Sequence, residues 1–363
     1  MITVLTLISL GFVCIQLLNA TLNLIFRQKL SKTAPNIPSL ISVLIPVRNE
    51  ELNIIALLNS LKEINTPLIE IIVFNDQSTD NTAAILQECS KSDPRIRTIS
   101  ADSLPPGWLG KNWACHKLAA AAKGEYLLFL DADVTLSGNI IANTVNTMSQ
   151  QNLGLLSIFP RQRHITLSEQ LSVPLMNYIL LTLLPLVLVR VSPFSSHSAA
   201  NGQFMLFRAA TYNKIQPHSL FRKCAVEDIA IAKYLKKNRI KVSCLTGDER
   251  VECRMYTSYQ EAIQGFSKNI FMFFGNSPVL AFIFFTCATL GVVAAALYSN
   301  AALALYLLIV FLVQITYAAA CGQNPFLTAA LFPAHLFFML QVIIRALNSR
   351  NNKTLEWKGR NIC

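Results

Sequence analysis

The sequence predicts a membrane-anchored α/β protein whose main domain is built on a mostly parallel β-sheet. Short, apolar, β-rich runs alternate with helical patterns between residues 39 and 160, which is typical of βαβ units. Uncharged apolar runs lie on both sides of this region, and each has the length of about 20 residues that a bilayer-spanning helix needs. Such sheets bind ligands at the carboxyl ends of their strands, so functional side chains are expected there.

The composition favours a membrane protein and gives no sign of nucleic-acid binding. The 363 residues are 53% hydrophobic and 14% charged, whereas soluble domains carry about 25% charged residues. The net charge of +11 is spread among apolar segments, so an anionic membrane surface or an anionic substrate explains it without nucleic acid. Nine cysteines without a CxxC pair indicate neither a disulfide framework nor a structural zinc site. Reduced thiols favour a cytoplasmic location of the main domain.

Residues 1–27 are expected to form an N-terminal transmembrane anchor. The run 2–26 is uncharged, and it lacks the short apolar core, the basic flank and the cleavage site of a signal peptide. Arg27, Lys29 and Lys32 follow it, and by the positive-inside rule they place the downstream chain in the cytoplasm.

The main domain is expected at residues 38–277. Its strands are predicted from the runs SLISVLIPV, EIIVFND and EYLLFLDADV. The segment 171–191 is also apolar but is interrupted by Pro174 and Pro185. A full crossing there would move half of the domain across the membrane, so we expect an interfacial or re-entrant helix, with an ordinary buried helix as the alternative.

Residues 278–347 are expected to form two or three further transmembrane helices, followed by a basic tail at 348–363. An outside N-terminus, one anchor and three later crossings would place this tail outside, which conflicts with the positive-inside rule. A re-entrant last segment, which contains Pro325 and Pro333, would remove the conflict. The sequence leaves the number of crossings open.

Asp131 and Asp133 follow the predicted strand YLLFL directly. Residues i and i+2 of an extended segment face the same way, so the two carboxylates can hold one metal ion or divide metal and ribose between them. Mg²⁺ or Mn²⁺ prefers such oxygen ligands and would bridge the diphosphate of a nucleotide sugar. The ion would then stabilise the departing nucleoside diphosphate as a Lewis acid. A helix cap or a turn is the alternative, and the position at a strand end favours binding.

Asp76 ends a second predicted strand, EIIVFND. Its carboxylate can accept hydrogen bonds from a uracil-type base or from ribose hydroxyls. The alternative is a turn into QSTDNT, in which Ser78 or Asp80 caps the next helix. We expect binding for Asp76 and capping for Asp80.

Glu227 and Asp228 begin the predicted helix VEDIAIAKYLKKN. A carboxylate at a helix N-terminus is stabilised by the helix dipole, which suits a general base that deprotonates an acceptor hydroxyl. One base is sufficient for a direct displacement at an anomeric carbon, which inverts its configuration. Simple capping is the alternative, and position alone does not decide between the two.

A family resemblance connects these features. The order and spacing of four motifs resemble the family 2 glycosyltransferases of GT-A fold: SVLIPVRNEELNI, VFNDQSTDNT, FLDADV and VEDIAIAKYLKK. Four more are similar to the membrane-bound subgroup associated with hopanoid and carotenoid pathways: PPGWLGKNWACHKLA, NGQFMLFRAATY, RMYTSYQEAIQGFSKNIF and WKGR. The resemblance runs from about residue 39 to the C-terminus. It implies a Rossmann-like GT-A domain, a hexosyltransferase activity and a place in a bacterial inner membrane.

The resemblance also implies roles for individual residues. Asp131 would bind the nucleotide and Asp133 the metal, while Asp228 would be the catalytic base with Glu227 in support. The nucleoside and diphosphate would meet Pro46, Arg48, Glu50, Asp76 and Lys111. The floor of the acceptor site would be formed by Gly202, Gln203 and Phe204.

Processive relatives carry a Gln-x-x-Arg-Trp motif near the membrane entrance. This chain has Gln264 followed by GFSKN and lacks the Arg-Trp pair, so transfer of a single sugar is expected. Positive charge near the diphosphate is expected from Arg254, Lys268 and Arg360. Trp357, in the terminal WKGR, is a further acceptor or diphosphate candidate.

The sequence therefore predicts an inverting, metal-dependent transfer of one sugar from a nucleotide sugar, with a UDP-sugar as the expected donor, to a membrane lipid. A carotenoid-like or hopanoid-like terpenoid is the acceptor that the resemblance implies. A polyprenyl phosphate is the alternative acceptor, and its ionised phosphate would need little base catalysis. The alternative to an enzyme is a non-catalytic transport or lipid-binding protein, which would need no base at Asp228. The sequence leaves the sugar, the lipid and the oligomeric state open.

Overall fold

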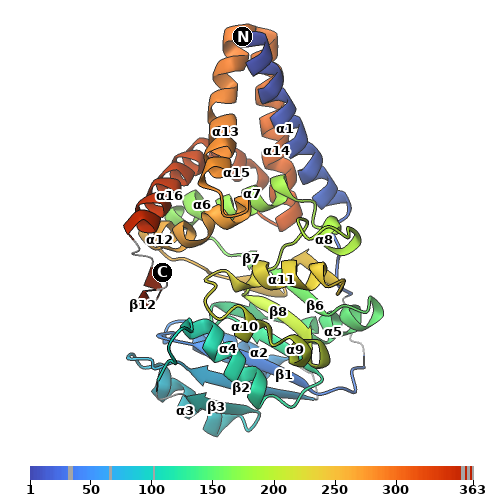
Figure 1. Ribbon diagram of the computed structural model, residues 1–363, viewed down its shortest axis with the longest axis vertical. Helices are drawn as coiled ribbons and strands as arrows, with labels where there is room; N and C mark the ends of the chain where they lie inside the picture. Colours follow the sequence, from blue (N-terminus) through green and yellow to red (C-terminus); the bar gives the residue numbers. More distant parts are fainter. Residues whose placement is uncertain (32–35, 65–67, 101–102, 353–355, 358–359, 362–363) are drawn as a thin grey trace. The chain divides into compact units, whose positions relative to one another are not determined.

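The computed structural model describes residues 1–363 except for 32–35, 65–67, 101–102, 353–355, 358–359 and 362–363 (Figure 1). The chain divides into two compact units. A helical unit comprises Met1–Arg27, Gln162–Val187 and Arg254–Cys363, and an α/β unit comprises Gln28–Arg161 and Leu188–Cys253. These boundaries differ from the expected single range 38–277, because residues 162–187 and 254–277 contribute helices that pack within the helical unit.

A seven-stranded sheet forms the centre of the α/β unit, in the order β3-β2-β1-β4-β8-β6-β9 (Figure 1). Neighbouring strands are parallel from β3 to β4 and again between β6 and β9, whereas β8 is antiparallel to both β4 and β6. The predicted mostly parallel sheet is therefore confirmed. The strands are β1 (Ile41–Val47), β2 (Ile69–Asn75), β3 (Ile96–Ser100), β4 (Tyr126–Leu130), β6 (Leu155–Phe159), β8 (Phe204–Arg208) and β9 (Val242–Thr246).

The central strands are nearly continuous apolar runs because they are covered on both faces. Every residue of β4 and β6 is buried, and so is every residue of β1 except Pro46. The unit contains the helices α2 (Ile54–Glu63), α3 (Thr82–Ser92), α4 (Gly110–Ala121), α5 (Ile140–Gln150), α8 (Val187–Val191), α9 (Ala209–Ile215), α10 (Pro217–Leu220) and α11 (Glu227–Lys237). A small second sheet has the order β5-β10-β7, with β5 (Val134–Leu136), β10 (Val251–Cys253) and β7 (Arg161–Gln162).

The reversed direction of β8 determines what lies at the carboxyl edge of the large sheet. Since β8 is antiparallel to β4, its first residue pairs with the last residue of β4, Phe204 with Leu130. The residues just before β8 therefore lie beside those just after β4. This pairing brings the segment Asn201–Gln203 to Asp131, whose backbone N–H donates to the carbonyl oxygen of Gln203 at 3.3 Å.

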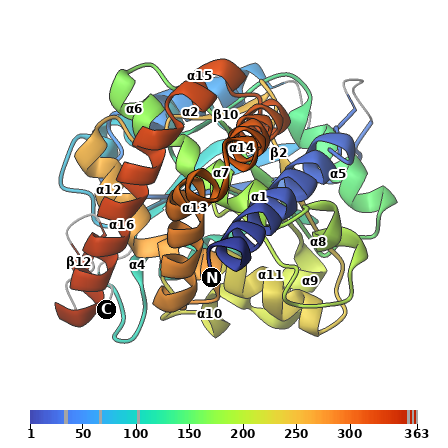
Figure 2. The ribbon, with the colours of Figure 1, turned by 90° about the horizontal axis from the view of Figure 1, so that it is seen from above.

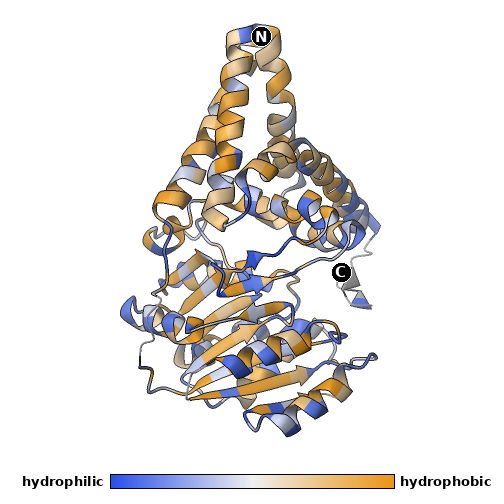
Figure 3. Cartoon of the chain, turned by 180° about the vertical axis from the view of Figure 1, so that it is seen from behind, coloured by the Kyte–Doolittle hydropathy of each residue, from blue (hydrophilic) through white to orange (hydrophobic). Residues whose placement is uncertain are grey.

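Three helices of the helical unit are long and apolar enough to cross a bilayer, counting only the described residues. They are α1 (Ile2–Ile25), α13 (Pro278–Tyr298) and α14 (Asn300–Cys321), and α1 packs along the other two (Figure 2). Figure 3 shows how strongly apolar these helices are. The unit also contains α6 (Leu167–Ser172), α7 (Pro174–Leu183), α12 (Tyr259–Asn269), a 3₁₀ helix (Ile270–Phe274), α15 (Pro325–Ala330), α16 (Phe332–Asn352), β11 (Glu356–Trp357) and β12 (Arg360–Asn361).

The apolar segment 171–191 contains the end of α6 and two further short helices, α7 and α8, but no long helix. α7 has 10 residues, which corresponds to about 15 Å and is half the thickness of the hydrocarbon core. Polar side chains of α1 hold it: Gln16 donates to the hydroxyl of Tyr178 at 2.9 Å, and Asn23 donates to the carbonyl oxygens of Leu181 and Leu184. The last predicted segment, 325–347, forms α15 and most of α16, neither of which is among the three candidate spans.

Candidate active site

The carboxyl edge of the large sheet carries a cluster of charged side chains around Lys111. This lysine lies in the first turn of α4, and its Nζ is 2.7 Å from Oδ1 and 2.8 Å from Oδ2 of Asp131. Oε1 of Glu227 is 3.7 Å from the same nitrogen. Burial alone would lower the pKa of Lys111, but the carboxylates of Asp131 and Glu227 raise it above its ordinary value. The ammonium group is therefore a permanent cation at this edge.

Asp133 lies between β4 and β5, two residues beyond Asp131, and its two carboxylate oxygens have different surroundings. Oδ2 accepts a hydrogen bond from Nε2 of Gln203 at 3.0 Å. Oδ1 is buried and has no hydrogen-bond partner among the described residues. Burial of the carboxyl group, reinforced by the charge of Asp131, raises the pKa of Asp133 to about 7. A bound cation would reverse this effect and keep the carboxylate ionised.

Glu227 and Asp228 occupy the first turn of α11, as the sequence predicts. Oδ2 of Asp228 accepts a hydrogen bond from the backbone N–H of Gly202 at 2.9 Å, and its Oδ1 accepts one from Ile229 at 2.8 Å. Burial raises the pKa of Asp228 and raises that of Glu227 to about 7. Glu227 can therefore take up a proton close to neutral pH, and the raised pKa makes Asp228 a stronger base than an ordinary aspartate, which suits proton transfer.

Gly202 is surrounded by the charged groups of this cluster. A Cβ atom at this position would lie 3.0 Å from Nζ of Lys111 and 3.6 Å from the nearest carboxylate oxygens of both Glu227 and Asp228. Even a methyl group would therefore press on the ammonium group. The glycine allows the lysine and the two carboxylates to approach each other, and it was predicted as part of the acceptor floor.

Replacing Gly202 with alanine is expected to lower kcat/KM by about 10-fold, because the added methyl group would displace the ammonium group of Lys111, and misplacement of a catalytic group slows the reaction. Steady-state kinetics on purified protein measure the effect. Gly11→Ala is the matched control, since a Cβ at Gly11 would meet nothing within 4 Å. Equal kcat/KM values for both variants would show that the spacing around Lys111 does not matter.

The predicted nucleoside residues lie at the ends of β1 and β2. Arg48 donates from Nη1 to the carbonyl oxygens of Asp76 at 2.7 Å and of Gln77 at 3.1 Å. Asp76 is buried, and its backbone N–H donates to the carbonyl oxygen of Val47 at 2.8 Å. The charge of Glu50 contributes to the raised pKa of Asp133, so the two ends of the predicted donor site interact electrostatically. Pro46 lies within β1 and is half-buried.

Asp80 was expected to cap α3, but the N-cap residue is Asn81, and Asp80 precedes it and contacts the first residue of the helix. Its Oδ1 accepts a hydrogen bond from the backbone N–H of Thr82 at 3.0 Å, at the start of α3, and its Oδ2 accepts one from Glu51 at 3.1 Å. The neighbouring Asn75 accepts from the backbone N–H of Ser78 at 3.1 Å. These turns fix the loop after β2 on which Asp76 lies.

The described residues contain no cluster of three or more His, Cys, Asp or Glu side chains that could hold a metal ion alone. Mg²⁺ is commonly bound through one or two carboxylates together with substrate phosphates, so this arrangement fits a metal that arrives with a diphosphate. The buried Oδ1 of Asp133 is the observation that supports the fit. Asp133, with Asp131, provides the donor set that such an ion would use.

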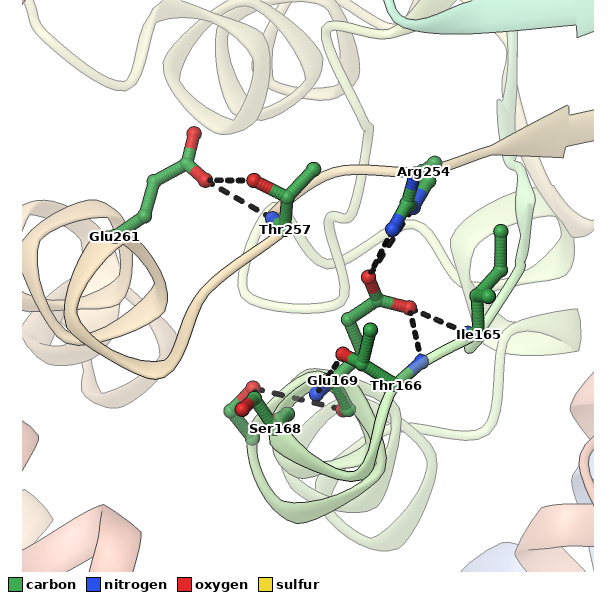
Figure 4. A network of polar contacts seen from close by, with 8 residues as sticks. Ile165, Thr166, Ser168, Glu169, Arg254, Thr257 and Glu261 are labelled. Atoms are coloured by element: carbon green, nitrogen blue, oxygen red, sulfur yellow. Dashed lines mark hydrogen bonds and ion pairs between the residues drawn. The ribbon is translucent and has the colours of Figure 1, made fainter.

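Four predicted residues belong to the helical unit and not to the α/β unit: Arg254, Lys268, Trp357 and Arg360. Arg254 pairs with Glu169, whose side chain is completely buried, through Nη2 at 2.7 Å and Nε at 3.1 Å (Figure 4). Glu169 also accepts from the backbone N–H groups of Ile165 and Thr166. Lys268 lies in the last turn of α12, and Arg360 lies in β12. The side chain of Trp357 lies outside what the structure describes.

The structure also adds residues that sequence reasoning did not single out. Cys253, the last residue of β10, lies with its Sγ 2.8 Å from Nε2 of Gln203. Asn201 donates from Nδ2 to Oε1 of Gln203 at 3.3 Å. Gln203 itself was expected to line the acceptor site, yet its amide is buried against Asp133. Phe204, the third residue of the expected acceptor floor, is fully buried.

Known proteins share both sequence and fold with this chain. Residues 42–210 match the family described as Glycosyl transferase family 2. A 4,4'-diaponeurosporenoate glycosyltransferase of Staphylococcus haemolyticus is 29% identical over 239 residues, which are 63% of this chain but only 60% of that protein, less than two thirds of its length. A protein of the same name from Staphylococcus aureus is 26% identical over 339 residues, 88% of this chain and 87% of that one.

Among solved structures, a mannosyltransferase from Pyrobaculum calidifontis in complex with GDP-Man and Mn²⁺ is similar with a TM-score of 0.59. The match has 16% identity and covers 99% of both chains. At this identity the likeness concerns the fold. The family match spans β1 to β8 and includes Asp76, Lys111, Asp131 and Asp133. With its mostly parallel GT-A-like sheet and this match over residues 42–210, the chain is similar to the enzymes of glycosyl transferase family 2.

Proposed function

We propose that this enzyme transfers a single sugar, with inversion, from a nucleotide sugar to the carboxylate of a membrane-embedded, carotenoid-like acid. The observation that carries the proposal is the arrangement of Asp131, Glu227 and Asp228 around Lys111, with Asp133 beside them, at the carboxyl edge of the sheet. The acceptor class is supported by the two staphylococcal relatives, whose shared name begins with that of a carboxylate, 4,4'-diaponeurosporenoate. A UDP-sugar is the proposed donor.

On the donor side, Asp133 and Asp131 are proposed to hold Mg²⁺ or Mn²⁺ together with the donor diphosphate. When bound, the metal supplies Lewis-acid stabilisation of the leaving group. Lys111 offers a fixed positive charge beside Asp131, where the diphosphate would add negative charge. The nucleoside is proposed to lie against Pro46, Arg48, Glu50 and Asp76. The similar mannosyltransferase was solved with Mn²⁺, which makes this ion the first to test.

On the acceptor side, a carboxylic acid has a pKa of about 4 and is already ionised at neutral pH. It can attack the anomeric carbon without a general base, unlike a hydroxyl group. An ionised acceptor would be repelled by ionised carboxylates, but burial raises the pKa of Glu227 to about 7. A protonated Glu227 can donate a hydrogen bond to the acceptor. The acidic pair on α11 is therefore compatible with a carboxylate acceptor as well as with a hydroxyl.

The membrane position of the acceptor is supported by the three long apolar helices α1, α13 and α14. A carotenoid-like acid has an apolar chain that lies in the bilayer, so its polar end would reach the enzyme at the interface. The basic residues Arg27 and Lys29 directly follow α1. We propose on this basis that the α/β unit acts at the cytoplasmic face.

Mass spectrometry of lipid extracts tests the proposal. Cells that make a carotenoid acid are compared with and without the chain, and with the Asp133→Ala variant as the inactive control. We expect one glycosylated lipid that carries a single sugar in an ester bond, present with the natural chain and absent with the variant. A glycosylated polyprenyl phosphate in its place would identify the alternative acceptor. If no lipid differs between the natural chain and the variant, the proposed function is wrong.

A further inference from the structure

Gln203 makes a direct contact with one oxygen of Asp133. Its Nε2 donates to Oδ2 at 3.0 Å, and the side chain of Gln203 is only 5% exposed. The same Nε2 lies 2.8 Å from Sγ of Cys253, which is also buried. Oδ1 has no hydrogen-bond partner among the described residues, although it is buried. One oxygen of the carboxylate is therefore held by the protein and the other is left for a ligand.

Asn201 determines which end of the Gln203 amide faces Asp133. Nδ2 of Asn201 donates to Oε1 of Gln203 at 3.3 Å, and Oδ1 of Asn201 accepts from the backbone N–H of Gln203 at 2.9 Å. With Oε1 used in this way, Nε2 is directed to Asp133. The opposite orientation would place the amide oxygen against a carboxylate oxygen, and neither group could donate.

Asn201 is itself held in place by the sheet. Oγ of Ser157, in the middle of β6, accepts from the backbone N–H of Asn201 at 2.8 Å and donates to its carbonyl oxygen at 3.1 Å. Ser157, Asn201 and Gln203 are all buried. A continuous chain of hydrogen bonds therefore runs from the rigid centre of the sheet to the side chain of Asp133.

We propose that Gln203 is a positioning residue that orients Asp133 and reserves its Oδ1 for the metal ion. The inference rests on the proposed function, because it assumes that a metal–diphosphate binds at Asp133. It changes the role of Gln203, which the sequence placed at the acceptor floor. Partners that orient metal ligands in this way typically contribute 10- to 100-fold to metal affinity.

Electron paramagnetic resonance of Mn²⁺, titrated into purified full-length protein with UDP present, tests this role. Gln203→Met keeps the length of the side chain but removes the amide, and we expect it to weaken Mn²⁺ binding by about 10- to 100-fold. The Mn²⁺ concentration for half-maximal activity should rise in step. The KM for the donor at saturating Mn²⁺ should change much less. A merely structural defect would instead weaken donor binding and Mn²⁺ binding together.

Gln151→Met is the matched control, since it makes the same chemical change at the end of α5 in the same unit. Gln203→Asn serves as a second variant that keeps an amide but shortens it, and it should weaken Mn²⁺ binding in the same direction. Mn²⁺ affinities of both Gln203 variants within twofold of the natural protein would overturn the inference. If the natural protein binds Mn²⁺ and transfers sugar while these variants match it, the proposed function stands and only the role of Gln203 is wrong.

Discussion

Replacing Asp133 with asparagine is expected to lower kcat/KM by at least about 1000-fold, which corresponds to roughly 4 kcal/mol of transition-state stabilisation. Asparagine keeps the shape of the side chain and one oxygen, so the hydrogen bond from Gln203 can persist. What it loses is the negative charge that a divalent cation needs. Initial rates measured over a series of Mn²⁺ concentrations separate a loss of metal affinity from a loss of turnover.

A matched control for this variant is Asp93→Asn in the same unit. Asp93 is also buried, but it pairs with Arg95 at 2.7 Å just before β3, and it is not among the predicted site residues. Its replacement should lower the melting temperature and leave kcat/KM nearly unchanged, because distant sites act independently. If Asp133→Asn retained more than about a tenth of the activity, a metal held by Asp133 would no longer be tenable.

Much of the fold was predictable because its strands are strongly apolar and short. The runs that form β1, β2 and β4 are bounded by polar residues. A strand covered on both faces needs apolar residues at nearly every position, and this continuous apolar pattern can be recognised in the sequence. The direction of β8 in the sheet was not predictable, since an apolar run looks the same whether its strand is parallel or antiparallel to its neighbours. The strands β5 and β10 have three residues each, which is too short for any periodic signal.

The candidate site also has one part that could be predicted from the sequence and another that could not. Asp76, Asp131 and Asp133 could be identified because they directly follow apolar strands in the sequence. The contact between Gln203 and Asp133 joins residues 70 positions apart, and it exists only because β8 runs antiparallel to β4. Cys253 comes to the same place through the pairing of β10 with β5, where it lies opposite Val134. Contacts of this kind depend on strand order, which no local pattern contains.

In the helical unit, one contact between helices could have been predicted from the sequence but was not. Gln16, Asn19 and Asn23 interrupt a mostly apolar anchor, and they lie on one face of α1 at helical spacing. In the structure all three bond to residues of the segment 178–186. Polar residues within a transmembrane helix are favoured only where partners satisfy them, so this stripe predicts a neighbouring element packed against the anchor.

Replacing Asp228 with asparagine is expected to separate the two possible classes of acceptor. For a lipid alcohol, the loss of the general base should lower kcat/KM by about 100- to 10,000-fold. For the corresponding carboxylic acid, which is ionised without help, the loss should stay below about tenfold. The measurement compares both acceptors in the same liposomes with the same donor.

The ratio of the two rates is the informative quantity, because the substitution also has a structural cost. Each oxygen of Asp228 accepts one backbone N–H, from Gly202 and from Ile229, and asparagine can satisfy only one of them. That cost of about 1 kcal/mol applies to both acceptors and cancels in the ratio. The pH dependence gives a second test: burial raises the pKa of Asp228, so transfer to an alcohol should rise with pH while the base loses its proton. Transfer to the acid should lack this rise, and an equal loss for both acceptors in the variant would contradict the carboxylate proposal.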